Sequence, residues 1–199
     1  MHTKRLYLLL FSLALNLLLL PCGAQDTNSM DWISIDGNRF VNESGQTMIF
    51  QGVNIRDPHN LEEDGNWTLS HFKEAKKWGA NIIRLPIHPV AWRARGEEEY
   101  LKLIDQAVEW AGQLDLYLIL DWHSIGNLKE EKFQHKMYIT TAKETYHFWA
   151  TVASRYANEP VVAMYELYNE PTVSGERFGD MSWPEWKEMN EEMISIIRK

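Results

Sequence analysis

An acidic, asparagine-containing segment stands among aromatic and apolar residues at Tyr165–Pro171, where the sequence reads YELYNEP. It directly follows the apolar run Val161–Met164. A carboxylate in an apolar setting is costly unless it is paired, hydrogen-bonded or neutralised, and burial raises its pKa. Glu170 is therefore expected either at the polar end of a strand or as an acid that burial keeps protonated near neutral pH.

Polar or aromatic residues also stand at the ends of three earlier apolar runs. These residues are Asn54, Arg56 and Asp57 at the first run, Arg84 and His88 at the second, and Asp121, Trp122 and His123 at the third. In a parallel barrel, functional side chains gather at the carboxyl ends of the strands, where loops can surround a ligand. The pattern predicts a site at this end of a parallel sheet.

Arg84 and His123 are the two basic candidates for this site. Arg84 interrupts an apolar run, and alternation along a strand places it on the same face as Ile82 and Pro86. Its permanent charge can hold a neighbouring carboxylate ionised, or it can form a structural salt bridge in a barrel core. Taken alone, His123 reads as a hydrogen-bonded strand end, but beside Asp121 it becomes a candidate ligand contact.

The elements that must position these residues alternate between strands and helices. Strands are predicted at 51–55, 81–87, 116–120 and 161–167, and helices at 69–78, at 97–114, along the stripe 138–156, and at 183–197. Roughly alternating residues within 32–50 predict short antiparallel strands joined by tight turns. Four strand–helix units indicate a parallel sheet, because each parallel return needs a crossover.

The predicted fold class is α/β, a (β/α)8 TIM barrel. Such a barrel needs about 250 residues, so this chain would cover about its first four βα units, preceded by a short β-hairpin. The alternative is an open, doubly wound sheet. Against it, the first strand–helix loop has no Gly-x-Gly-x-x-Gly pattern.

The amino terminus has the features of a secretory signal peptide over residues 1–24. Lys4 and Arg5 precede an apolar block, and small residues follow up to Ala24. The expected mature domain is 25–199, secreted to an extracellular or periplasmic location. Because the single cysteine, Cys22, lies in the leader, no disulfide is expected in the mature chain.

Charge and motif content exclude several classes of partner. The chain carries 20 basic and 28 acidic residues, a formal net charge of −8, which argues against nucleic acid and anionic membranes as partners. No His-Glu-x-x-His motif and no paired His-x-His occur, so neither a metal site nor a cofactor is expected.

Three motifs carry a resemblance to a known family. They are Ile83-Arg84-Leu85-Pro86, Asp121-Trp122-His123 and the segment Tyr165–Pro171. They resemble glycoside hydrolase family 5, the cellulase family, in order and spacing over about residues 32–199. Members of this family fold as eight-unit barrels and cleave β-linked polysaccharides with retention of configuration.

The resemblance implies a role for four residues. Glu170 would be the acid/base, Asn169 would hold the sugar 2-hydroxyl, and Arg84 and His123 would orient substrate and carboxylates. Adjacent residues on a regular strand face opposite ways, so a bulge or loop near Pro171 must bring both Asn169 and Glu170 to the ligand. The implied partner is a β-linked polysaccharide or oligosaccharide, either a glucan or a mannan.

Tryptophans are abundant for a chain of this length, with nine in total. Trp67, Trp92 and Trp183 fall in predicted loops above the sheet, where an aromatic face can stack on a sugar ring or pack in the core. Trp92 and Trp183 are retained as candidates for stacking.

Retaining hydrolysis needs a second carboxylate roughly 5–5.5 Å from the first, and the family places it on the seventh strand. Glu166 lies four residues before Glu170, about 13 Å along a strand, and Asp121 reads as a hydrogen-bonding support. The expectation is therefore a fragment without its nucleophile that is inactive alone. The alternatives are a non-catalytic carbohydrate-binding half-barrel and an inactive truncation.

Overall fold

The computed structural model describes residues 30–173 and 176–199. The predicted signal peptide, residues 1–24 with Cys22, lies outside the described residues. Within the described ranges, no helix combines the length and apolar character needed to cross a membrane.

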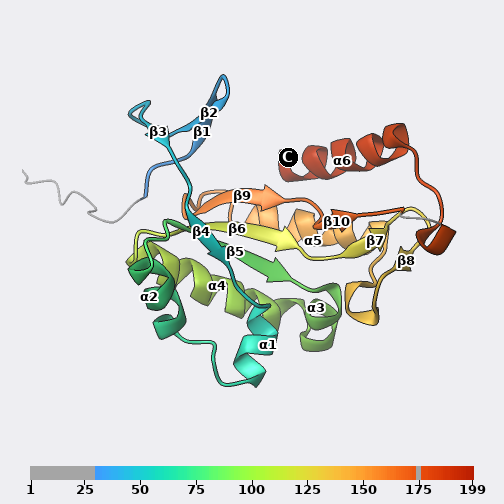
Figure 1. Cartoon of the computed structure of the whole chain (residues 1–199), viewed down its shortest axis with the longest axis horizontal. Helices are drawn as coiled ribbons and strands as arrows, with labels where there is room; N and C mark the ends of the chain where they lie inside the picture. The colour runs from blue at the N-terminus through green and yellow to red at the C-terminus, as the bar shows by residue number, and fades with distance from the viewer. Residues whose placement is uncertain (1–29, 174–175) are drawn as a thin grey trace, which may run out of the picture.

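Four parallel strands form the main sheet, in the order β4-β5-β6-β9 (Figure 1). Their bounds are Gly52–Asn54 for β4, Ile82–Ile87 for β5, Tyr117–Trp122 for β6 and Val162–Glu166 for β9. The order in space follows the order in sequence, as in a barrel, whereas a doubly wound sheet reverses direction at a switch point. The prediction of about four βα units of a barrel is confirmed.

Six α-helices are described. Their bounds are Pro58–Glu63 for α1, Leu69–Lys77 for α2, Pro89–Arg95 for α3, Glu97–Gln113 for α4, Ala142–Arg155 for α5 and Trp183–Ile197 for α6. The short helices α1 and α3 were not predicted, and each begins with a proline, which favours the first helical turn.

The predicted third helix begins later than the apolar stripe suggested. The Thr141 side chain accepts a hydrogen bond from the Glu144 backbone N–H and so caps α5. Tyr138 lies instead in η1, a 3-10 turn at Lys136–Tyr138.

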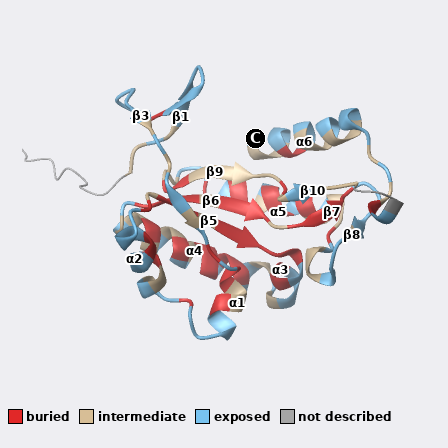
Figure 2. Ribbon diagram, viewed as in Figure 1, coloured by how far each residue is buried: buried red, intermediate tan, exposed pale blue. Residues whose placement is uncertain are grey.

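One face of the sheet packs against the helices and forms the core (Figure 2). The residues that face the helices are Ile83, Leu85 and Ile87 from β5 and Leu118, Leu120 and Trp122 from β6, all fully buried. They lie against apolar residues of α4 and α5 in one cluster. Since each fully buried large apolar side chain contributes about 1.5–3 kcal/mol, this face accounts for much of the stability.

The other face of the sheet is covered less. Arg84, Ile119 and Met164 lie side by side in register across β5, β6 and β9, and all three are half-buried. Ile82, which alternation places on the face of Arg84, is buried, with 4% of its surface exposed. In the described part of the chain, β4 and β9 each pair on one side only.

The predicted hairpin is a three-stranded antiparallel meander set apart from the main sheet (Figure 1). Its strands are Ser34–Asp36 for β1, Arg39–Val41 for β2 and Thr47–Met48 for β3. Phe50 lies between the rings of Phe40 and Tyr117, at centroid distances of 5.5 and 5.7 Å. This aromatic contact joins the meander to the amino end of β6.

A second small sheet, in the order β10-β7-β8, was not predicted. Its strands are Ile125–Asn127 for β7, Lys132–Phe133 for β8 and Glu170–Pro171 for β10, and a 3-10 turn, η2, follows at Glu176–Phe178. At Gly126, with φ of 148°, an added Cβ would lie 2.4 Å from the Lys132 carbonyl oxygen. Only glycine allows β8 to approach β7 so closely.

Candidate active site

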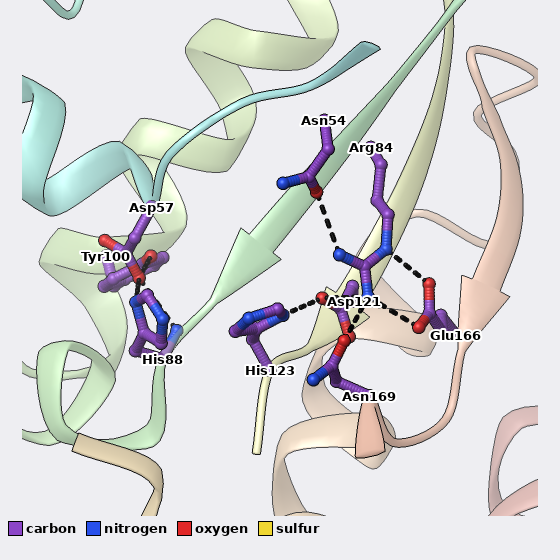
Figure 3. Close-up of polar contacts among 9 residues, drawn as sticks. All are labelled: Asn54, Asp57, Arg84, His88, Tyr100, Asp121, His123, Glu166 and Asn169. Atoms are coloured by element: carbon purple, nitrogen blue, oxygen red, sulfur yellow. Dashed lines mark hydrogen bonds and ion pairs between the residues drawn. The ribbon is translucent and has the colours of Figure 1, made fainter. Parts of the chain in front are cut away.

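Arg84 is the centre of a polar cluster at the carboxyl ends of the parallel strands (Figure 3). Its Nε and Nη2 donate to the two carboxylate oxygens of Glu166, both at 2.6 Å. Its Nη1 donates to Asn54 Oδ1 at 2.8 Å. A bidentate guanidinium–carboxylate pair fixes geometry as well as charge, so Arg84 ties β4 and β9 to β5.

Two more oxygens lie against the same guanidinium. Nη2 of Arg84 donates to Asn169 Oδ1 at 2.6 Å and lies 2.9 Å from Asp121 Oδ2. The hydrogen bond to Glu166 raises the pKa of Arg84 further above its usual value, and the charges of Asp121, Glu166 and Glu170 add to this. The prediction that Arg84 meets a carboxylate is confirmed, and the structure supplies two.

Asp121 is fully buried between Arg84 and His123. Its Oδ2 lies 2.5 Å from His123 Nδ1, and its Oδ1 has no hydrogen-bond partner among the described residues. Burial raises the pKa of Asp121, while the hydrogen bond from His123 and the charge of Arg84 oppose that rise. Its position is that of a support for two neighbouring side chains, as its sequence context suggested.

Asn169 and Glu170 lie where the chain changes its pairing partner. β9 ends at Glu166, after which the Asn169 backbone N–H donates to the Trp122 carbonyl and that of Glu170 to the Ser124 carbonyl, at 3.2 and 3.0 Å. Glu170 then pairs in β10 with β7. The irregular strand end that the adjacent polar pair required is therefore present.

Glu170 is exposed, so of the two alternatives the polar strand end is confirmed and the expected burial is wrong. The aromatic neighbours that suggested burial point elsewhere: Tyr168, for example, is buried at 5% exposure and its hydroxyl lies 2.9 Å from Ser124 Oγ. β10 is an edge strand of its small sheet, so only β7 lies beside it among the described strands. The charge of Glu170 nevertheless acts on Arg84.

The two tryptophans proposed for stacking differ in exposure. Trp92, on α3, is 5% exposed and packs against Phe148 at 5.0 Å and Tyr100 at 5.5 Å between ring centroids. Its proposed place above the sheet is wrong, because α3 turns this residue into the core. Trp67 is likewise buried. Trp183, the first residue of α6, is 74% exposed and lines a hollow with Pro171 and Trp186.

Sequence reasoning missed three members of this region. Glu166 received no role, although alternation along β9 places it in register with Asp121 on β6, on the face of Arg84. Asp57 and His88 were noted only as strand-end residues. Asp57 is fully buried and His88 is 8% exposed; His88 lies beside His123, and Asp57 lies against His88 (Figure 3).

No group of three or more His, Cys, Asp or Glu side chains is arranged to hold a metal ion within residues 30–173 and 176–199. The polar groups of the cluster are hydrogen-bonded mainly to one another. What the arrangement offers chemically is an exposed carboxylate, Glu170, directly after an amide, Asn169, that Arg84 holds in a fixed orientation.

Solved structures with the same fold include a close relative in sequence. The β-glucanase SdGluc5_26A from Saccharophagus degradans is 51% identical, with a TM-score of 0.84, over 85% of this chain and 51% of that one. The same enzyme in complex with cellotetraose matches equally well.

Curated relatives are more distant. Endoglucanase A of Butyrivibrio fibrisolvens is 25% identical over 83% of this chain, and an endoglucanase of Paenibacillus polymyxa is 26% identical over 82%. The chain spans 36% and 44% of the lengths of these two proteins.

The family profile described as cellulase, glycosyl hydrolase family 5, matches residues 41–199. This match covers the main sheet, all six α-helices and every residue of the Arg84 cluster. Together with the four parallel βα units, it establishes that the chain belongs to glycosyl hydrolase family 5, the cellulase family.

Proposed function

We propose that this protein is a retaining glycoside hydrolase that cleaves β-linked glucan, with Glu170 as its acid/base. One observation carries the proposal: the carboxyl ends of four parallel strands converge on Arg84, which holds Asn169 directly before the exposed Glu170. An exposed carboxyl group beside a fixed polar cluster is accessible to the oxygen of a scissile bond. Family membership supports this assignment.

Asn169 is oriented for hydrogen bonding to substrate. Its Oδ1 accepts from Arg84, which can only donate, so the amide nitrogen must lie on the other side of the group. This Nδ2 is buried and has no partner among the described residues. Because an unpaired buried donor is unfavourable, a sugar hydroxyl that accepts from it would be bound strongly.

His123 is held in a defined tautomer in this proposal. Its Nδ1 faces the Asp121 carboxylate at 2.5 Å, so the proton lies on Nδ1 and Nε2 remains an acceptor. An acceptor at Nε2 can orient a sugar hydroxyl. Arg84 acts differently, because its donors are directed at carboxylate and amide oxygens, and its part is to fix Glu166 and Asn169.

The second carboxylate of a retaining mechanism must stand roughly 5–5.5 Å from Glu170 and be free to attack. Glu166 is bound bidentately by Arg84, and Asp121 contacts both Arg84 and His123. Both are therefore supports in our proposal. We place the nucleophile outside the four described units, on the barrel strand to which the family resemblance assigns it.

The substrate is proposed to be β-glucan in preference to mannan. The basis is the 51% identical β-glucanase, whose structure with cellotetraose is known. Trp183 supplies an exposed aromatic face near β10, where a glucosyl ring can stack.

The test is a substrate panel with the complete gene product. We expect reducing sugar to be released from mixed-linkage β-glucan or carboxymethylcellulose faster than from mannan, and Glu170→Gln to remove most of this activity. Glu188→Gln, an exposed carboxylate on α6, is the matched control and should leave activity unchanged. Binding of β-glucan without hydrolysis would favour the carbohydrate-binding alternative, and activity on mannan alone would overturn the substrate assignment.

Export of the protein is a separate proposal, which rests on residues 1–24. A polymeric substrate has to be met outside the cell, so a secreted enzyme fits the proposed activity. Amino-terminal sequencing of the protein from its native host should give a chain that starts at Gln25. A mature chain that retains Met1 would contradict the proposal.

A further inference from the structure

We propose that His88, held by Asp57, is a positioning residue for His123, and that its ring keeps the His123 imidazole aligned with Asp121. The inference rests on the proposed function only in that His123 is taken to contact substrate. Neither His88 nor Asp57 belongs to the Arg84 cluster.

Asp57 is a fully buried carboxylate that joins three parts of the fold. Its Oδ1 accepts from the His59 backbone N–H at 2.8 Å, at the start of α1. Its Oδ2 accepts from the His88 backbone N–H and from the Tyr100 hydroxyl of α4, both at 2.8 Å. These hydrogen bonds fix the main chain of His88 at the point where β5 ends and α3 begins.

The His88 ring is held between Asp57 and His123. Its Nδ1 lies 3.2 Å from Asp57 Oδ2, although that nitrogen makes no hydrogen bond in the described structure. The ring meets the His123 imidazole at a centroid distance of 4.9 Å and an interplanar angle of 85°. Tyr138 lies against both rings, at 5.8 and 6.0 Å.

His123 needs such a neighbour because hydrogen bonds do little to fix its ring. Among the described residues its side chain makes one hydrogen-bond contact, from Nδ1 to Asp121, and otherwise packs against the rings of His88 and Tyr138. Rotation about the Cβ–Cγ bond would break the contact with Asp121 and turn Nε2 away from the sugar hydroxyl that it is proposed to orient. The edge-to-face ring of His88 lies in contact with the imidazole and opposes this rotation. His88 therefore acts on the reaction through His123.

The experiment compares three variants of the complete gene product. His88→Ala removes the ring, and His88→Phe restores a ring without nitrogen atoms. Leu85→Ala is the matched control, since Leu85 is a fully buried residue of β5, three residues before His88, on the face toward the helices. It lowers stability without touching His123.

We expect His88→Ala to lower kcat about 10- to 100-fold, as small misplacements of site groups do, with KM changed far less. His88→Phe should recover most of this loss, and Leu85→Ala should reduce thermal stability while kcat stays close to that of the wild type. Equal kcat in His88→Ala and Leu85→Ala would overturn the inference. So would a His88→Phe variant as impaired as His88→Ala.

A spectroscopic readout separates this inference from the proposed function. The imidazole 15N resonances of His123, assigned by their loss in His123→Asn, should report a proton on Nδ1 in the wild type and a mixture of tautomers in His88→Ala. An inactive wild type with this change in the spectrum would refute the proposed function and leave the positioning role standing. An unchanged spectrum would refute the positioning role.

Discussion

At the scale of single residues, Arg84 does the most to define the site. Asp121, Glu166, Asn54 and Asn169 all place an oxygen within 2.9 Å of its guanidinium. A lysine could supply the charge but not the planar set of donors that this arrangement uses. The site is therefore built around one cation, whose removal takes the donor from the half-buried oxygens of Glu166 and Asn169.

The Arg84→Ala substitution should destabilise the protein by about 3 kcal/mol near neutral pH, because it removes the permanent charge beside the buried Asp121 carboxylate and leaves it only its contact with His123. Burial already raises the pKa of Asp121 in the folded state, and loss of the Arg84 charge raises it further. Because the pKa of Asp121 is higher in the folded than in the unfolded state, the protein loses stability as pH rises above the pKa that Asp121 has when unfolded. The loss caused by Arg84→Ala should therefore be smaller near pH 4 than near pH 7.

Urea unfolding at both pH values measures this difference. Lys187→Ala serves as the control, because Lys187 forms an exposed pair with Glu191 one helical turn away and should change stability little at either pH. A loss for Arg84→Ala that is equal at the two pH values would argue against Asp121 as the group involved.

Trp183 permits a comparison between two exposed tryptophans. Trp183 and Trp78 are 74% and 72% exposed, but Trp183 lines a hollow with Pro171 of β10, whereas Trp78 lines one beside β4. Trp183→Ala should raise KM for cello-oligosaccharides roughly tenfold, since an aromatic contact is worth about 0.5–1.5 kcal/mol beyond its buried area. Trp78→Ala should leave KM unchanged. Steady-state kinetics on cellotetraose measure KM for both variants. Equal effects of the two substitutions would show that Trp183 does not contact the substrate.

At the scale of elements, the segment 178–182 leads from η2 into α6. Asn127 of β7 fixes part of it, since its Nδ2 donates to the carbonyls of Phe178 and Asp180 at 2.8 and 3.2 Å. α6 then begins with a capping box, in which the Ser182 hydroxyl accepts from the Glu185 backbone N–H and Glu185 accepts from the Ser182 backbone N–H. This cap fixes the start of α6 and therefore the position of Trp183, its first residue.

Ser182→Ala should lower the free energy of unfolding by about 1 kcal/mol, the usual contribution of a side-chain cap. Thr68→Ala is the control: Thr68 occupies the same position at α2 but makes no capping hydrogen bond there, so the loss should be smaller. Chemical denaturation of the two variants tests this. A larger loss for Thr68→Ala would mean that capping does not explain the start of α6.

The elements that sequence predicted are those with local signals. The long apolar runs of β5 and β6 and the cap at Ser182 are read directly from neighbouring residues. The helix α3 was missed because its seven residues carry little periodic signal, and the position of Trp92 was wrong for this reason. The β10–β7 pairing depends on contacts between segments about 45 residues apart, which no local pattern reports.

The candidate site was predictable in part. The motifs located Arg84, Asp121, His123, Asn169 and Glu170, and the structure brings the first four into contact. The exposure of Glu170 could not be read from its apolar neighbours, because the chain changes sheets between Glu166 and Glu170 and no longer alternates as one strand. Asp57 was equally hidden, since its partners are backbone groups of distant segments.

At the scale of the whole molecule, the sheet face that holds the polar cluster is only partly covered. Ile119 and Met164 are half-buried on this face, and the outer sides of β4 and β9 are unpaired among the described strands. Unpaired strand edges and uncovered apolar surface favour association with another chain or segment.

The polypeptide 25–199, expressed by itself, should therefore self-associate and should not release reducing sugar from carboxymethylcellulose or mannan. Two properties lead to this: the partly covered sheet face, and the engagement of Asp121 and Glu166 with Arg84, which leaves neither free to attack. Light scattering and a reducing-sugar assay measure the two outcomes. A stable monomer whose activity disappears on Glu170→Gln would show that a second carboxylate lies within this polypeptide.

The role of Glu170 as proton donor is tested most directly by how the effect of Glu170→Gln depends on the leaving group. The complete gene product and its variant are compared on unactivated β-glucan and on aryl β-cellobiosides with leaving groups of decreasing pKa. A general acid contributes about 10²–10⁴-fold when the leaving group needs a proton and far less when it does not. We predict a large loss on glucan that shrinks steadily as the leaving group becomes more acidic, whereas an equal loss on all substrates would contradict the assignment of Glu170 as the acid.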